Sequence, residues 1–106
     1  MANYVLVVMT NPTPGNDAEY NRWYDEVHLP DVCNVPGFNS ARRFRLADGE
    51  GAFKYLAVYE VQTGDIKACL ADLGSRAGTD RMTMSPALDM QNISMQVFEQ
   101  ISQYPK

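Results

Sequence analysis

Histidine, tryptophan and cysteine are all scarce in this 106-residue sequence, which contains one His, one Trp and two Cys. Two cysteines, Cys33 and Cys69, are too few for a disulfide framework. They are typical of a protein kept in a reducing compartment, so we expect a cytoplasmic protein. One histidine and two distant cysteines form no cluster with metal-ligand spacing, so we expect no metal site.

Basic charge and long apolar runs are also lacking. Nine Lys and Arg against thirteen Asp and Glu give a net charge of −4, so we expect no basic face for nucleic acid. The longest apolar run, Val5 to Met9, is too short to span a bilayer, and the pattern of a secretory signal is absent. Hydrophobic residues make up 45% and charged residues 21%, which is typical of a globular protein. The length predicts a single domain over residues 1–106.

The sequence has none of the loops that bind common organic cofactors. Gly49-Glu50-Gly51 lacks the third glycine and the following helix of a dinucleotide loop, and no phosphate-binding loop or Gly-x-Ser-x-Gly elbow is present. We therefore expect chemistry without a cofactor. A haem bound through His28 stays open, although nothing in the sequence is specific for it.

The hydrophobic patterning predicts the element order β-α-β-β-α-β. Strands are expected at residues 3–10, 38–46, 52–61 and 92–103, with a hairpin turn at 47–51 and a long loop at 76–90. Asp17 is expected to cap a helix that ends or bends near His28, because Pro30 disfavours helical geometry at the residue before it. A second helix begins at Thr63 or Asp65. This order predicts an α+β, ferredoxin-like fold with an antiparallel sheet and both helices on one face.

The first strand is apolar on both faces. Tyr4, Leu6 and Val8 alternate with Val5, Val7 and Met9, so neither face of the sheet is patterned for solvent. An open apolar face on a small domain needs a cover, and a second copy of the chain is the simplest one. We therefore expect a homodimer formed through the open sheet face. The alternative is that segment 76–90 folds back over the sheet.

His28 is the main candidate for chemistry. Helical spacing places Tyr24 one turn before it, at the border of an apolar stripe, and Asp25 or Asp31 within reach of its ring. An imidazole at such a border, with a carboxylate partner, can act as a general acid or base near neutral pH. The position at a helix C-terminus is expected to favour the protonated form. The alternative is that His28 only caps the helix end.

Other candidates are aromatic or basic. Tyr20, Trp23 and Tyr24 have the spacing of core residues or of walls around a ligand. Arg43, in a cluster with Arg42 and Arg45, would either hold a substrate carboxylate or guard a solvated strand edge.

The segment around His28 also carries a resemblance. The residues Tyr20-Asn21-x-Trp23-Tyr24-Asp25-x-x-His28-x-Pro30, followed by Val35-Pro36-Gly37-Phe38, resemble the EthD-like branch of the dimeric α+β barrel proteins. The resemblance implies a ferredoxin-like monomer, dimers packed sheet to sheet, and a pocket between helices and sheet. It also implies small-molecule chemistry, mostly without organic cofactors, with His28 as the catalytic residue. The reaction is not implied, because a fold hosts many functions.

The leading hypothesis is a cofactor-independent lyase, isomerase or cyclase that acts on a ring-containing phenolic or polyketide-like metabolite. His28 would move a proton, Asp25 would hold the imidazole, and Tyr24 would donate to a developing oxyanion. The substrate would contact Trp23, Tyr20, Phe44, Tyr55 and Arg43. The alternatives are a cofactor-free monooxygenase of a phenolic substrate, a non-catalytic protein that binds a hydrophobic metabolite, and a purely structural dimer.

Overall fold

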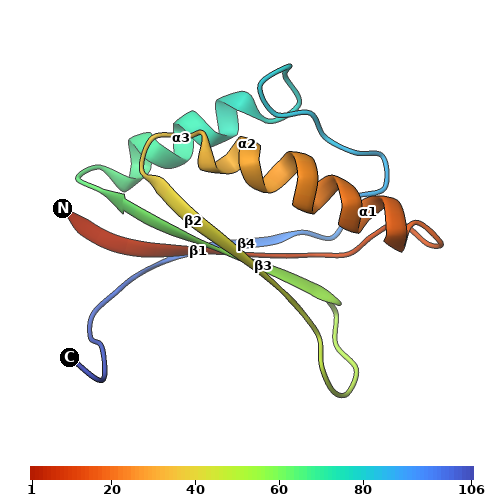
Figure 1. The fold of residues 1–106 in the computed structure, drawn as a ribbon, viewed down its shortest axis with the longest axis horizontal. Coiled ribbons are helices and arrows are strands. Elements are labelled where there is room, and N and C mark those ends of the chain that lie inside the picture. The colour runs from red at the N-terminus through yellow and green to blue at the C-terminus, as the bar shows by residue number, and fades with distance from the viewer.

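The computed structural model describes residues 1–106 and shows one antiparallel sheet with every helix on the same side (Figure 1). The strands are β1 (Ala2–Thr10), β2 (Phe38–Arg45), β3 (Tyr55–Thr63) and β4 (Ser94–Glu99), in the spatial order β2-β3-β1-β4. The helices are α1 (Asp17–Trp23), the π-helical turn η1 (Tyr24–His28), α2 (Leu29–Cys33) and α3 (Ile66–Arg76). The predicted ferredoxin-like fold is confirmed. None of the helices is both long and apolar enough to cross a membrane.

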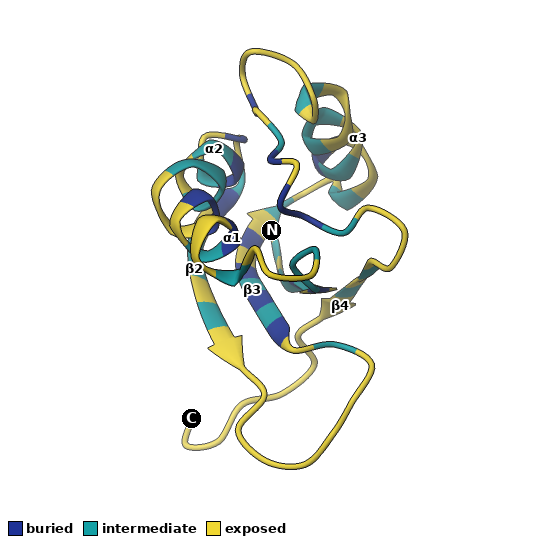
Figure 2. Ribbon diagram, turned by 90° about the vertical axis from the view of Figure 1, so that its right-hand side faces the viewer, coloured by how far each residue is buried: buried dark blue, intermediate teal, exposed yellow.

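The core lies between the helices and one face of the sheet (Figure 2). Leu6 on β1 is paired with Tyr59 on β3 and with Val97 on β4, so these three side chains share the face that the helices cover. Leu6 and Tyr59 are buried, and Val97 packs against the core from the edge strand. Burial of this face is the main apolar stabilisation available to so short a chain.

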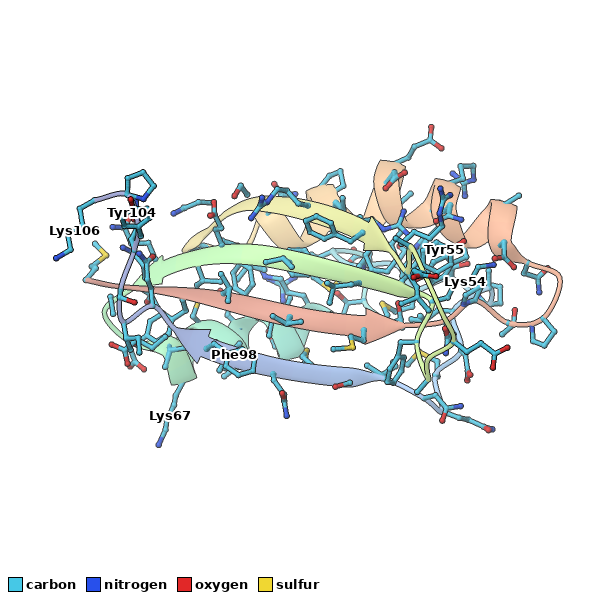
Figure 3. All side chains as sticks on the ribbon, turned by 90° about the horizontal axis from the view of Figure 1, so that it is seen from below. Lys54, Tyr55, Lys67, Phe98, Tyr104 and Lys106 are labelled. Atoms are coloured by element: carbon cyan, nitrogen blue, oxygen red, sulfur yellow. The ribbon has the colours of Figure 1, made fainter.

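The other face of the sheet is largely apolar and has no helix over it (Figures 1 and 3). Its central row pairs Val7 with Val58 and ends in Arg42 on β2 and Gln96 on β4. Phe98 on β4 and Phe44 on β2 lie on the same face, with 51% and 46% of their surface exposed. The sequence predicted that neither face of the sheet is patterned for solvent, and this second face does remain exposed in the single chain.

The segment between α3 and β4 does not cover that open face, so the alternative to a second copy is wrong. It crosses the helix side of the sheet instead, from the end of α3 toward α1 (Figure 1). Its distal end is held by the loop after β1, because Thr13 N donates to Ala87 O at 2.7 Å and Asp89 N donates to Asn11 O at 3.0 Å.

The hairpin between β2 and β3 is longer than predicted. The last bond across it runs from Leu46 N to Lys54 O at 2.8 Å, and β3 begins only at Tyr55. Asn11 explains the difference, since its side chain donates to Ala52 O and accepts from Lys54 N, both at 2.8 Å. These bonds engage backbone groups that would otherwise extend the strand ladder.

Two helix starts were predicted, and one of them is wrong. Asp65 caps α3 as expected, because its carboxylate accepts from Ala68 N at 3.1 Å. Asp17 is instead the first residue of α1, and its carboxylate accepts from Lys54 Nζ at 2.7 Å. Lys54, which is distant in the sequence, thus binds the Asp17 carboxylate that local sequence rules assign to the helix cap.

Gly37 and Gly74 give opposite stability predictions. Gly37 has φ +98°, and an added Cβ would lie 3.1 Å from Cys69 Sγ and 3.2 Å from Gln62 O. Gly37→Ala should therefore lower the free energy of unfolding by about 1 kcal/mol or more. Gly74 lies inside α3 with nothing within 4 Å of an added Cβ, so Gly74→Ala should raise the free energy of unfolding by up to about 1 kcal/mol. Urea unfolding of both variants measures this, and equal effects would contradict it.

Candidate functional site

The helix that carries the candidate residues does not end at His28. Leu29 N donates to Tyr24 O, which closes a five-residue π turn, and the chain continues as α2 to Cys33. Pro30 lies in the first turn of α2, where its fixed φ fits the helix. Of the two predicted outcomes near His28, an end of the helix is wrong, and a bend is matched by the change of helical geometry just before Pro30. Single π turns inside α-helices are frequent at functional sites.

The π turn brings Trp23 and His28, which are five residues apart, onto one face of the helix. Their rings stack with centroids 4.6 Å apart and an interplanar angle of 26°. The Tyr24 ring meets His28 edge to face at 5.1 Å and 86°. The Trp23 indole donates from Nε1 to Thr83 O at 2.9 Å, which also ties the segment after α3 to this helix.

His28 faces a cavity of about 320 Å³ between the helices and the sheet. Fifteen of its nineteen lining residues are hydrophobic, and none is Asp, Glu, Lys or Arg. The walls come from the helix around His28, from α3, from the segment after α3 and from β1, β3 and β4: Leu6, Val8, Thr10, Trp23, Tyr24, His28, Val32, Tyr59, Leu70, Leu73, Gly74, Ala77, Met82, Met84, Leu88, Ile93, Met95, Gln96 and Val97. A mostly apolar cavity with a few convergent polar groups is the usual form of a small-molecule site.

The imidazole of His28 is uncharged in this setting. Its Nδ1 is buried and has no hydrogen-bond partner. Burial lowers the pKa of His28 from 6.5 to about 4, since no nearby carboxylate stabilises the imidazolium. The expectation that a helix C-terminus favours the charged form is wrong, because the helix runs past His28 and desolvation dominates.

Asp25 does not orient the imidazole, so that prediction is also wrong. Its carboxylate accepts from Arg43 Nη1 at 2.8 Å, and 61% of its side chain is exposed. An α-helical spacing would have left it beside His28, but the cation on β2 holds it on the outer side of the helix.

Two tyrosines accompany His28 in the lining. Burial raises the pKa of Tyr24 to about 12 and that of Tyr59 well above its usual range. Both phenols are therefore protonated at every ordinary pH. The Tyr59 hydroxyl is shielded like Nδ1 of His28, so Tyr59 contributes its ring to the lining and not a donor to a ligand.

Arg43 is absent from the cavity lining and holds no position for a substrate carboxylate. Besides Asp25, its guanidinium donates to Asn21 Oδ1 at 2.7 Å. Only 12% of its side chain is exposed, and its charge lies 4.4 Å from the Tyr24 ring centroid. Both predicted roles are wrong, because Arg43 instead fastens the helix to β2 from behind Tyr24.

Three predicted substrate contacts lie outside the cavity. Tyr20 is completely buried, and its hydroxyl meets Thr10 Oγ1 at 2.5 Å. Tyr55 is buried on the other side of Tyr20 and donates to Asp17 Oδ2 at 3.2 Å. Phe44 points to the open face of the sheet. The first two are core residues and the third is on the wrong face, so these predictions are wrong.

The sequence did not identify Tyr59 as a lining residue, and it left open whether Met82 and Met84 pack around a ligand or in a plain core. Tyr59 alternates with outward-facing residues on β3, a signal that cannot separate a lining residue from a core residue. Met82 and Met84 lie in a segment without periodic patterning, so nothing in the sequence places them over His28. The structure does bring Trp23, Tyr24 and His28 together at the cavity, and their roles stay predictions.

No family model and no curated protein matches the sequence. Solved structures match in fold along nearly the whole chain. MhuD from Mycobacterium tuberculosis, a heme-degrader solved with two hemes in its active site, gives a TM-score of 0.65 at 19% identity over 94% of this chain and 97% of its own.

A variant of SnoaB from Streptomyces nogalater, a cofactor-independent oxygenase, gives a TM-score of 0.61 at 14% identity over 100% of both chains. An EthD family protein from Bacillus halodurans gives 0.54 at 16% identity over 95% of this chain and 100% of its own. The chain therefore shares the ferredoxin-like α+β fold of these proteins, and the resemblance to the EthD-like branch is confirmed as a likeness of fold.

The buried imidazole predicts a specific loss of stability in acid. The unfolded chain takes up a proton on His28 near pH 6.5, whereas the folded chain does so only near pH 4. Stability should therefore fall as the pH drops through this window, by up to about 3 kcal/mol for this group. Carboxylates with lowered pKa values also lose stability in acid, so the quantity to compare is the difference from His28→Phe. Urea unfolding of both proteins between pH 7 and pH 4 measures it, and parallel curves would contradict it.

Proposed function

We propose that this chain is a small-molecule enzyme in which neutral His28 abstracts a proton from a ring-containing phenolic or polyketide-like compound bound in the cavity. The observation that carries the proposal is an uncharged imidazole in an apolar cavity, with Nδ1 shielded and without a partner. Nε2 is then the nitrogen left to meet a ligand. A nitrogen that is unprotonated near neutral pH and faces space for a ligand can accept a proton, and its pKa of about 4 makes it a weak base until an anion lies beside it.

The missing carboxylate determines which proton can be taken. A protonated His28 would be a buried cation without a counter-ion, which is unfavourable in a lining that holds no charged side chain. Proton transfer from the ligand creates an imidazolium and an anion at the same moment, at contact distance. The anion of the substrate can therefore serve as the counter-ion, which favours an acidic phenol, enol or carbon next to a carbonyl as the reacting group.

Tyr24 would stabilise that anion. Its hydroxyl keeps its proton because burial raises its pKa to about 12, whereas the hydroxyl of Tyr59 is shielded from the cavity. Donors fixed in place before the reaction stabilise a developing oxyanion without reorganisation. Trp23 supports the base itself, because its ring stacks on the imidazole.

The reaction that follows is assigned to the lyase, isomerase or cyclase type. The imidazolium of His28 returns the proton to another atom of the anion, or the anion first forms or breaks a carbon–carbon bond and is then reprotonated by His28. The likeness in fold to SnoaB, a cofactor-independent oxygenase, favours a second candidate. In that candidate the same phenolate reacts with molecular oxygen. Both candidates share the first step at His28, and only the second consumes oxygen.

Haem is a poor match for this cavity, although MhuD shares the fold. Haem carries two propionate groups, and no Lys or Arg lines the cavity to pair with them. A haem in this cavity would leave both propionates without a cation partner in the lining.

The proposed base predicts a large loss of turnover in His28→Phe, which keeps an aromatic ring against Trp23 but has no basic nitrogen. A panel of phenols, lactones and polyketide-like compounds, without added cofactor, should include one that wild type converts. The variant should convert it about 10² to 10⁴ times more slowly. Running the panel with and without oxygen separates the two candidates. Cys33→Ser, outside the cavity lining, is the control and should keep wild-type turnover.

Two outcomes would overturn the proposal. Equal turnover in wild type and His28→Phe would remove the histidine from the mechanism. If a compound binds but no compound is converted, a non-catalytic protein that carries a hydrophobic metabolite is favoured.

We also propose a homodimer through the open sheet face. Its centre is the pair Val7 and Val58, and its rim includes the half-exposed Phe44 and Phe98. A second copy would remove this apolar surface from water, and identical faces suit a two-fold axis.

Val58→Lys should therefore convert the dimer to a monomer, because it places an unpaired charge at the centre of the interface. Lys67→Glu on the exposed side of α3 changes a charge away from this face and should leave the dimer intact. Light scattering after size exclusion measures both masses. A dimer that survives Val58→Lys would show that another surface is used.

A further inference from the structure

We propose that the cavity selects uncharged, flat ring systems with a single acidic O–H or C–H, and that it rejects ligands bearing a carboxylate or a phosphate. The position of the acidic group rests on the function proposed for His28. The selection against anions does not, because it follows from the lining alone.

The lining holds no cation to replace the water around a carboxylate or a phosphate. Its polar side chains are neutral: Thr10, Tyr24, His28 and Tyr59. Moving an ionised carboxylate from water into such a site is strongly unfavourable unless a cation or several donors meet it. His28 cannot supply that cation at neutral pH, because its pKa is about 4.

The nearby basic residues are engaged elsewhere. Arg43 is held behind Tyr24 by Asp25 and Asn21, at 2.8 and 2.7 Å. Arg76 ends α3 beside the lining residue Ala77, but its Nε donates to Asp72 at 2.9 Å. Turning either guanidinium into the cavity would break these bonds and leave a carboxylate without its partner, so neither is available to a ligand.

The walls favour a flat apolar ligand. Leu6 and Val97 on the sheet form one wall, and Leu70 and Leu73 on α3 form part of the opposite side. Apolar side chains on two facing layers can pack against both faces of an aromatic ring. Met82 adds an unbranched, polarizable side chain that can follow the outline of a ring. The volume of about 320 Å³ lies at the small end of ligand sites.

Three naphthalenes separate charge from shape and acidity. Naphthalene has the ring alone, 1-naphthol adds an acidic hydroxyl, and 1-naphthoate adds a carboxylate that is ionised at pH 7. We expect naphthalene and 1-naphthol to bind wild type, and 1-naphthoate to bind about tenfold or more weakly. In His28→Phe, 1-naphthol should lose about threefold or more in affinity while naphthalene does not. Titration calorimetry measures all of these affinities.

A charge introduced at the mouth of the cavity should reverse the selection. Ile93 lines the cavity and is 41% exposed, so Ile93→Arg can place a guanidinium there without burying it. This variant should bind 1-naphthoate about tenfold more tightly than wild type does. Met90 is 62% exposed and outside the lining, so Met90→Arg changes the net charge equally and should have no effect.

The selection is overturned if wild type binds 1-naphthoate as tightly as 1-naphthol, or if none of the three compounds binds. It is also overturned if Ile93→Arg and Met90→Arg gain equally in affinity for 1-naphthoate. These readouts use affinity alone, so they are independent of turnover. If selective binding holds and no compound is converted, the proposed catalysis fails and the selection stands. If a neutral phenol is converted and 1-naphthoate binds equally well, the selection fails and the catalysis stands.

Discussion

The π turn at Tyr24–His28 is the constraint on which the site depends. An uninterrupted α-helix would need an N–H at residue 30, which proline lacks, and would place His28 above Tyr24 rather than above Trp23. The wider turn carries the helix past Pro30 and moves His28 onto the ring of Trp23, at 4.6 Å. The same movement withdraws the imidazole from Asp25 and from the polar edge of the helix. The π turn thus leaves His28 as a desolvated base without a carboxylate partner.

Arg43 fixes the other side of the same helix. The guanidinium lies against the rings of Tyr20, Tyr24 and Tyr55, at 5.4, 4.4 and 5.5 Å. Its bonds to Asp25 and Asn21 tie β2 to the helix from outside the cavity. One layer of tyrosine rings therefore separates the charged pair Arg43 and Asp25 from the apolar cavity. Behind the rings the contacts are ionic and hold the helix in place, while in front of them the lining is neutral and open to a ligand.

Patterns within one segment were predictable and contacts between distant segments were not. Alternating hydrophobicity located all four strands, and helical spacing placed Trp23, Tyr24 and His28 near one another. The long hairpin depends on Asn11, and the start of α1 depends on Lys54, neither of which is adjacent in sequence to the backbone it affects. The pairing of Asp25 with Arg43 spans 18 residues, so local spacing assigned both residues to the wrong partners. The π turn leaves no mark in hydrophobic periodicity, and the orientation of His28 was missed with it.

A desolvated histidine without a carboxylate is a different catalyst from one in a paired site. A carboxylate partner would hold the imidazolium before any substrate arrives and would raise the pKa of His28, whereas this cavity lowers it to about 4. The base is weak while the site is empty, and it gains its counter-ion only when the ligand gives up its proton. Proton transfer in such a site is therefore coupled to the acidity and fit of the ligand. A lining without charged groups then serves both catalysis and selection, because any fixed anion would stabilise the protonated base and any fixed cation would admit the ligands that it now excludes.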